Sequence, residues 1–301
     1  MDSSIRSCAL AANFNDPRVA ECAAALVPLL QARSLAVLAL DDPSRGRPPA
    51  GVAVVAADRL LADTHLMIAI GGDGTLLHAA RQVASQGASR DIPLLGINRG
   101  RLGFLTDVMP KDMGPSIDAV LAGDCEADRR PLLRARLVDA SGAERSELAL
   151  NDVVILRRET GRLLDFETQV DGRYLNSHSG DGMVIATATG STAYALSCGG
   201  PIVEPRLNVL VLAPIAPHTL SDRPIVVPGD VTIEIRTAAQ ADGVAGVTCD
   251  ATLLGELAPG ARLVVTPAGR SITLLHPPGY DYYRLLRSKL HWGRGGVAHE
   301  R

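Results

Sequence analysis

A change in hydrophobic periodicity near Arg129-Arg130-Pro131 most constrains the fold of this 301-residue chain. Before this point, apolar runs typical of buried strands alternate with segments that repeat apolar residues at helical spacing. After it, short segments alternate apolar and polar residues with period two, separated by turn signals such as Ser141-Gly142 and Asp171-Gly172. The pattern predicts an α/β domain with a parallel sheet, followed by an all-β, sandwich-like domain.

The predicted domains are an α/β domain over residues 1–126 and a β domain over 127–278. Helical spacing returns from Tyr280 to Leu290, so we expect 279–301 to pack on the first domain. The elements expected in the α/β domain are strands over 7–12, 35–40, 66–70 and 92–97, a helix after Asp16-Pro17 and a helix from about Leu76.

Composition excludes several classes of protein. The net charge of −3 gives no basic footprint for nucleic acid. The five cysteines are scattered and form no Cys-x-x-Cys pair, so we expect reduced thiols and no structural zinc. No apolar run reaches the roughly 18 residues of a membrane-spanning helix, and the N-terminus does not resemble a signal peptide. We therefore expect a cytoplasmic protein without a membrane or nucleic-acid partner.

The segment Gly71-Gly72-Asp73-Gly74-Thr75 directly follows the apolar run 66–70. Glycines let the backbone turn sharply and approach a ligand, and the N–H groups that open the following helix favour phosphate. A carboxylate there is explained by metal binding or by proton abstraction. Leu77 occupies the third glycine position of the dinucleotide fingerprint, and no P-loop occurs. A plain glycine-rich surface turn with a solvated Asp73 remains the alternative.

Two polar segments interrupt the β domain. Asn151-Asp152 lies within an apolar strand, so at least one of its side chains should be buried and hydrogen-bonded, unless the pair starts a strand or forms a bulge. The segment 187–194 is rich in hydroxyls and follows the apolar run 183–186. It can offer hydroxyls and amides to a ribose or phosphate, with Tyr194 beside an adenine ring, or it is an ordinary helix cap.

Together these segments resemble bacterial NAD kinases of the ATP-NAD kinase family. The Gly-Gly-Asp-Gly-Thr motif is shared with diacylglycerol-kinase-like and phosphofructokinase-like enzymes, whereas the later motifs are more specific. The resemblance spans roughly residues 66 to 292 and implies a Rossmann-like N-terminal domain of that kind and a β-sandwich-like C-terminal domain. The matching pieces, in family order, are 71–75, 96–107, 151–152, 181–182, 189–194, 199–202 and 214–220.

The resemblance implies a phosphotransferase with an alcohol group as acceptor. It would move the γ-phosphoryl of ATP to the 2′-hydroxyl of the adenosine ribose of NAD, giving NADP, with a divalent cation for which we expect Mg²⁺. It also implies a homodimer or homotetramer whose NAD site a neighbouring subunit completes. The sequence leaves open the metal ligands, the number of subunits, feedback by NADP(H), and the choice between ATP and polyphosphate and between NAD and NADH.

The resemblance also implies roles for individual residues. Asp73 would accept the proton of the 2′-hydroxyl, and Asp181 would contact the nicotinamide end. Thr192, Ala193, Tyr194 and Ser197 would hold the adenosine, whose pocket Phe104 would line. The other residues expected to bind phosphates or NAD are Gly71, Gly72, Gly74, Thr75, Asn151, Asp152, Arg162, Ser179, Ala195, Leu196, Ala216 and Thr252.

This chain departs from the family pattern at two positions. Asp152 stands where members usually carry Glu, so its contact is one methylene shorter. Ser179 stands where many carry a basic residue, and the loss of a fixed charge near the nicotinamide should weaken discrimination between NAD and NADH. We therefore expect some NADH kinase activity. His178 is either a partial replacement for that charge or an exposed strand histidine.

Two other functions remain open from the sequence. A lipid or sugar kinase would share the motif at 71–75, although the cluster at 189–194 suits a dinucleotide better. A non-catalytic NAD(P)-binding regulator would not need Asp73 beside phosphates.

Overall fold

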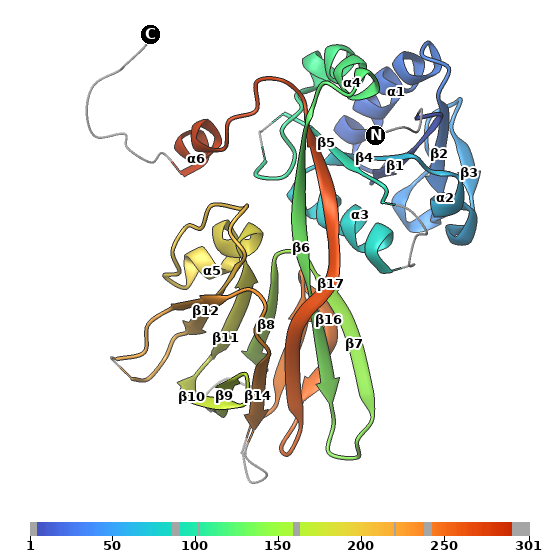
Figure 1. Ribbon diagram of the computed structural model, residues 1–301. Helices are drawn as coiled ribbons and strands as arrows, with labels where there is room; N and C mark the ends of the chain where they lie inside the picture. The colour runs from blue at the N-terminus through green and yellow to red at the C-terminus, as the bar shows by residue number, and fades with distance from the viewer. Residues whose placement is uncertain are drawn as a thin grey trace, which may run out of the picture. The chain divides into compact units, whose positions relative to one another are not determined.

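The computed structural model describes residues 5–85, 91–100, 103–158, 163–219, 221–237 and 243–290. These residues form two compact units, which are labelled by element in Figure 1. The first unit contains the chain up to Asp128 and again from Ile272, and the second contains Arg129–Ser271. Within the described ranges, no helix is long and apolar enough to cross a membrane.

The first unit alternates strands and helices. Its elements are β1 (Ser7–Ala12), α1 (Pro17–Gln31), β2 (Ala36–Leu40), the 3₁₀ turn η1 (Pro43–Arg45), β3 (Ala53–Val55), α2 (Ala57–Asp63), β4 (Leu66–Gly71), α3 (Asp73–Ser85), β5 (Leu94–Asn98), η2 (Pro110–Asp112), α4 (Met113–Ala122) and, near the C-terminus, α6 (Tyr282–Leu290).

The sheet of this unit is parallel, in the order β3-β2-β1-β4-β5, and the last residues of β17 (Arg262–His276) pair with β5 through Leu274 and Leu94. Figure 1 shows α1 and α4 on one face of the sheet and α2 and α3 on the other. Because both faces are covered, β1, β4 and β5 are buried along their whole length, which explains their continuous apolar runs. The carboxyl ends of β4 and β5 carry the motif at 71–75 and the loop after Asn98.

Local sequence accounts for these elements. Asp16 caps α1 by accepting from the Arg18 N–H, and Pro17 occupies the first turn, as predicted. Leu26 and Leu30 of α1 are fully buried, and each such side chain contributes about 1.5–3 kcal/mol. The predicted strand over 7–12 is confirmed, and β3 is an addition that the sequence reading missed because its three residues give no periodicity.

One predicted boundary is wrong. The helix after the glycine-rich motif begins at Asp73, not near Leu76. Gly74 has low helix propensity, which hid the first turn from the sequence reading. Asp73 is therefore a first-turn helical residue, where its negative charge interacts favourably with the helix dipole.

The second unit consists mainly of β-strands. Its elements are β6 (Glu126–Val138, which begins in the first unit), β7 (Glu144–Ala149), β8 (Asp152–Arg157), β9 (Leu164–Val170), β10 (Arg173–Gly180), β11 (Gly182–Thr187), η3 (Thr189–Thr192), α5 (Tyr194–Ser197), β12 (Val209–Ile215), β13 (Ile225–Pro228), β14 (Ile233–Thr237), β15 (Ala245–Cys249), β16 (Thr252–Leu257) and the first part of β17.

Two sheets enclose the core of this unit. One is ordered β13-β12-β11-β8-β15-β16, and the other contains β10-β9-β14-β17 with β6 and β7. Phe166 and Ile233 from one sheet and Ile155 and Ile185 from the other belong to one buried cluster. The period-two pattern predicted for this unit is seen in β9, where Leu164, Phe166 and Thr168 are buried and the intervening Asp165 and Glu167 are exposed.

Candidate functional site

The carboxylate of Asp73 is held by the loop that follows β5. Its Oδ2 accepts from the Phe104 N–H at 2.8 Å, and its Oδ1 accepts from the N–H groups of Leu105 and Thr106 at 3.0 and 3.2 Å. The Thr106 hydroxyl also donates to Oδ1 at 3.2 Å. These donors stabilise the carboxylate anion and fix its orientation. The Asp73 carboxylate is therefore held in a fixed orientation rather than lying free in solvent.

The glycines around Asp73 have separate geometric reasons. Gly71 has a φ of 154°, and a Cβ there would lie 2.4 Å from the Thr75 hydroxyl. A Cβ at Gly72 or Gly74 would meet nothing within 4 Å. Because the first N–H groups of a helix lack intrahelical partners, this open space suits an anion. The arrangement fits the predicted phosphate-binding role of Gly71, Gly72, Gly74 and Thr75.

Asn151 and Asp152 lie where β8 starts, and a carboxylate from a distant turn holds their backbone. Asp250 accepts from the N–H groups of Leu150, Asn151 and Asp152 at 2.8, 2.8 and 3.1 Å. Asp250 and Ala251 have φ values of 45° and 64°, as a tight turn before Thr252 requires. Both readings that the sequence left open hold in part, because the pair stands at the start of β8 and the Asp152 side chain is buried.

Asp152 is 6 % exposed, and burial, together with the nearby charge of Asp250, raises its pKa to about 7. A carboxyl group with this pKa is partly protonated at neutral pH, so it can donate as well as accept a hydrogen bond. The Asn151 Oδ1 is buried and has no hydrogen-bond partner among the residues that the structure describes. Both side chains therefore offer polar atoms that a ligand would satisfy.

The residues at the other end of β8 and β11 form a second group. Arg157 Nε donates to Asp181 Oδ1 at 2.5 Å. Ser179 accepts from the His218 N–H through its carbonyl, and Ala216 turns the chain with a φ of 43°. Ser179, Asp181 and Ala216 are thus neighbours. Arg157 supplies a cation at this end, and the expected effect of Ser179 on the choice between NAD and NADH stays a prediction.

The hydroxyl-rich turn packs on the backbone of Asn151. A Cβ at Gly190 would lie 2.1 Å from the Asn151 carbonyl, and Thr187 donates to the Leu150 carbonyl at 2.6 Å. Thr192 is half-buried and donates to the Thr189 carbonyl. The buried Arg130 donates to the Thr189 hydroxyl at 3.1 Å, a contact that the sequence reading missed.

The short helix α5 lies between the two groups. Tyr194 is 39 % exposed, and its pKa is raised by burial and by the charges of Cys198, Asp181 and Asp152. Burial and Asp152 also raise the pKa of the Cys198 thiol. Ala193 and Leu196 are half-buried, Ser197 is exposed, and the Ala195 side chain is fully buried in the core. Ala195 can therefore offer a ligand only its backbone.

Strand geometry gives the separation of the two groups. Gly182 of β11 pairs with Leu156, and Ala186 pairs with Asp152. At about 3.4 Å per residue, these four steps span about 14 Å. Polar groups at both ends and an exposed tyrosine between them suit an elongated ligand. Thr252 belongs to the Asp152 end because Cys249, at the other side of its turn, pairs with Val153.

The chain matches two family descriptions: ATP-NAD kinase N-terminal domain over residues 52–125 and ATP-NAD kinase C-terminal domain over 150–276. It is 44 % identical over 284 residues to the NAD kinase of Halorhodospira halophila, covering 92 % of this chain and 90 % of the relative. The chain belongs to the NAD kinase family. The NAD kinase of Nitrosococcus oceani is 42 % identical over 279 residues, covering 93 % and 94 %.

Two solved structures of NAD kinase relatives share the fold. Yeast NADH kinase in complex with NADH superimposes with a TM-score of 0.87 at 23 % identity, covering all of this chain and 91 % of the other. The NAD kinase of Archaeoglobus fulgidus in complex with ATP gives a TM-score of 0.69 at 25 % identity, covering 95 % and 98 %. The coarse prediction of an N-terminal α/β part and a C-terminal β part is thus confirmed.

Two of the residues singled out in the sequence, Arg162 and His178, need separate comment. Arg162 lies outside the described residues. His178 is 7 % exposed, not an exposed strand residue, and its Nδ1 lies 3.2 Å from Asp222 Oδ2. Burial lowers its pKa, although the hydrogen bond and charge of Asp222 oppose the shift, so its role as a partial replacement for the family's basic residue stays a prediction.

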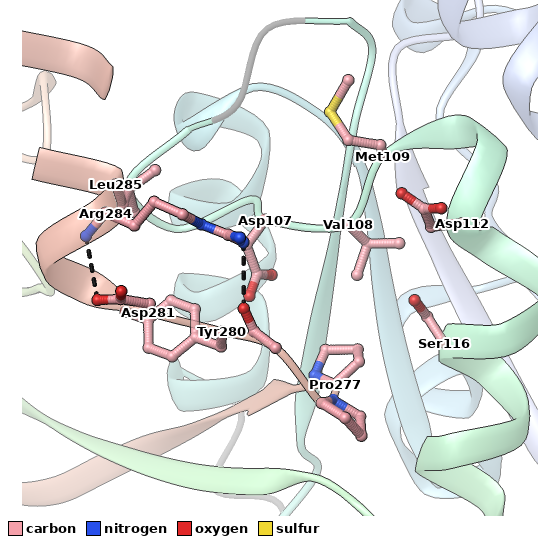
Figure 2. Close-up of a pocket in the computed structure, with 12 residues that line it drawn as sticks. Asp107, Val108, Met109, Asp112, Ser116, Pro277, Tyr280, Asp281, Arg284 and Leu285 are labelled. Atoms are coloured by element: carbon pink, nitrogen blue, oxygen red, sulfur yellow. Dashed lines mark hydrogen bonds between the residues drawn. The ribbon is translucent and has the colours of Figure 1, made fainter. Parts of the chain in front are cut away.

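A pocket of about 180 Å³ lies within the first unit, and Asp73 is not among its lining residues. Figure 2 shows Tyr280, Asp281 and Arg284 on one side and Asp112 and Ser116 on the other. It borders a buried network in which His276 Nδ1 lies 2.8 Å from Asp107 and His276 Nε2 lies 3.5 Å from Asp128. The His276 ring stacks on the Tyr280 ring, with the two ring centroids 3.7 Å apart. This network fixes the chain between β17 and α6.

Proposed function

We propose that the protein is an NAD kinase that transfers the γ-phosphoryl of ATP to the 2′-hydroxyl of the adenosine ribose of NAD. The observation that carries the proposal is the Asp73 carboxylate, held by three backbone amides in the first turn of α3 beside open glycines. Phosphoryl transfer needs positioning and charge neutralisation more than covalent catalysis. A carboxylate fixed beside an anion site can orient a hydroxyl and receive its proton as the phosphorus–oxygen bond forms.

The β unit supports a dinucleotide rather than a lipid or sugar as substrate. We assign the Asn151–Asp152 end and the exposed Tyr194 to the adenosine half of NAD, and Asp181 with Ser179 to the nicotinamide half. The roughly 14 Å between the two groups suits an elongated molecule with polar groups at both ends. Phe104 and Arg162 are assigned to the same ligand by family resemblance.

The α/β unit supplies the phosphate-binding residues in this proposal. Its strand order, β3-β2-β1-β4-β5, is that of doubly wound folds, which supports a Rossmann-like, phosphofructokinase-like classification. We retain 1–126 with 279–301 and 127–278 as the proposed functional domains. We also propose a cytoplasmic homodimer or homotetramer, by family resemblance.

Mg²⁺ fits this site as a cation carried by ATP. Within the part of the chain that the structure describes, no group of three or more His, Cys, Asp or Glu side chains could hold a metal ion. Mg²⁺ usually binds through one or two carboxylates, water and substrate phosphates, so an all-protein cage is not required. When bound, it would neutralise the phosphate charge. Asp73 is the carboxylate nearest to the proposed phosphate-binding glycines in sequence.

The test is formation of NADP from ATP and NAD by the purified protein, with NADH, polyphosphate, diacylglycerol and fructose 6-phosphate as parallel conditions. We expect Asp73→Asn to retain the fold and NAD binding and to lose about 10²–10⁴-fold in kcat, the usual contribution of a general base. Asp58→Asn is the matched control, because Asp58 is a first-turn carboxylate of α2 in the same unit. Near-normal turnover of Asp73→Asn would contradict the assignment. Tight NADP binding without turnover by the wild type would indicate a regulator.

A further inference from the structure

We propose that Thr106, oriented by Asn98, is a positioning residue that determines which oxygen of Asp73 receives the proton. This inference rests on the proposed function. Thr106 is fully buried and Asn98 is 2 % exposed, so neither hydroxyl nor amide is available to solvent. Asn98 Nδ2 donates to Thr106 Oγ1 at 3.0 Å, and Thr106 Oγ1 donates to Asp73 Oδ1 at 3.2 Å. A hydroxyl has one proton, so the donation from Asn98 directs that proton towards Asp73.

The two oxygens of Asp73 are therefore unequal. Oδ1 accepts three donors: the N–H groups of Leu105 and Thr106 and the Thr106 hydroxyl. Oδ2 accepts the Phe104 N–H. A carboxylate oxygen has about two lone-pair positions, so with the donors of the described residues Oδ1 is saturated and Oδ2 retains one position. We assign Oδ2 as the atom that faces the acceptor hydroxyl.

Two glycines allow this close arrangement. A Cβ at Gly103 would lie 2.0 Å from Asp73 Oδ1 and 2.4 Å from the Thr106 hydroxyl. A Cβ at Gly96 would lie 2.7 Å from the Leu105 carbonyl and 2.8 Å from the Thr106 Cα. Asn98 is held in turn, since its Oδ1 accepts from the Gly100 N–H at 2.9 Å. The loop after β5 therefore lies so close to Asp73 that Gly96 and Gly103 have no room for a side chain. This close approach holds the Asp73 carboxylate in place.

In the reaction, the 2′-oxygen forms a bond to the γ-phosphorus while the bond from that phosphorus to the bridging oxygen breaks, and ADP leaves. The proton of the 2′-hydroxyl passes to Asp73 Oδ2 and later to solvent. Thr106 does not touch the substrate. It holds Oδ1 so that Oδ2 keeps its orientation while charge redistributes.

The experiment compares steady-state kinetics of Thr106→Val, which keeps the shape and loses the hydroxyl, with Thr106→Ser, which keeps the hydroxyl. We expect Thr106→Val to lose about 10- to 100-fold in kcat, as for a hydrogen bond to a charged group, with KM for NAD within about threefold. Thr106→Ser should stay within about threefold of the wild type. In an Asp73→Asn background, Thr106→Val should cause no further loss, because both act on one carboxylate.

Thr64→Val is the matched control, because the fully buried Thr64 hydroxyl donates to the Leu60 carbonyl, away from Asp73. It should lower the melting temperature and leave kcat unchanged. Gly103→Ala should reproduce the kcat loss, since its Cβ displaces Oδ1. Wild-type kcat in Thr106→Val, equal losses in the Val and Ser variants, or additive loss with Asp73→Asn would overturn the inference. An inactive wild type would instead refute the proposed function.

Discussion

Asp152 gives a direct test of the electrostatics at the start of β8. Burial and the neighbouring Asp250 raise its pKa to about 7 from the ordinary 3.8. Each unit of pKa shift corresponds to about 1.4 kcal/mol, so this shift corresponds to a free energy of about 4 kcal/mol. Relaxation around the buried pair recovers part of this cost. We therefore expect the free energy of unfolding to change by on the order of 2–4 kcal/mol between low and neutral pH because of Asp152.

The sign follows from proton binding. Between pH 4 and 7 the folded protein keeps Asp152 protonated, whereas the unfolded chain releases that proton. The free energy of unfolding of the wild type should therefore fall as pH rises through this interval, and this part of the fall should be complete just above pH 7. Asp152→Asn mimics the protonated acid and does not titrate. The wild type should thus lose stability relative to this variant as pH rises.

Urea unfolding of both proteins at pH 4.5, 6.0 and 7.5 measures the difference directly. Asp165→Asn is the control, because Asp165 is an exposed carboxylate on β9 of the same unit. Its difference from the wild type should stay within about 0.5 kcal/mol at each pH. A difference between wild type and Asp152→Asn that does not change with pH would refute the reasoning.

The other predictions use the same contacts. Burial disfavours the charged form of His276, but Asp107 and Asp128 together outweigh burial and raise the pKa of His276. The stability that this charged form contributes should therefore be full below about pH 6.5 and lost as pH rises through the raised pKa. Urea unfolding of His276→Gln should show no such pH dependence. Arg157→Leu leaves the Asp181 carboxylate without its cation, which should raise the ratio of kcat/KM for NAD to that for NADH about fivefold, about 1 kcal/mol; an unchanged ratio would contradict a charge effect on the nicotinamide. Gly190→Ala places a Cβ 2.1 Å from the Asn151 carbonyl, so it should lower the free energy of unfolding by about 1–3 kcal/mol and weaken NAD binding. Urea unfolding measures the first effect and calorimetry the second, and wild-type values for both would contradict the packing argument.

The sequence predicted the kinds of elements well because most strands of the first unit are buried on both faces, whereas strands of the second unit such as β9 are buried on one. Continuous runs such as β4 and alternating segments such as β9 therefore appear directly in the residue pattern. The start of α3 was misplaced because Gly74 masks the first helical turn. Asp73 was found because a carboxylate among glycines is chemically unusual.

The supporting residues were not found because their signal is not local. Asp250 lies about a hundred positions from the amides that it accepts, and Arg157 looks like an ordinary polar residue at the end of a strand. Thr106 stands between Leu105 and Asp107, where a single threonine gives no local signal in the sequence. Only the fold brings these side chains to Asp152, Asp181 and Asp73.

The carboxylate of Asp250 links three consecutive amides, at Leu150, Asn151 and Asp152, to a single acceptor. These amides should therefore open together, and their hydrogen exchange should show one common rate rather than three. Changes at Asp152 also alter the charge that Asp250 faces. Among relatives, a substitution of Asp152 at the start of β8 should then be accompanied by a substitution of Asp250 in the turn after β15.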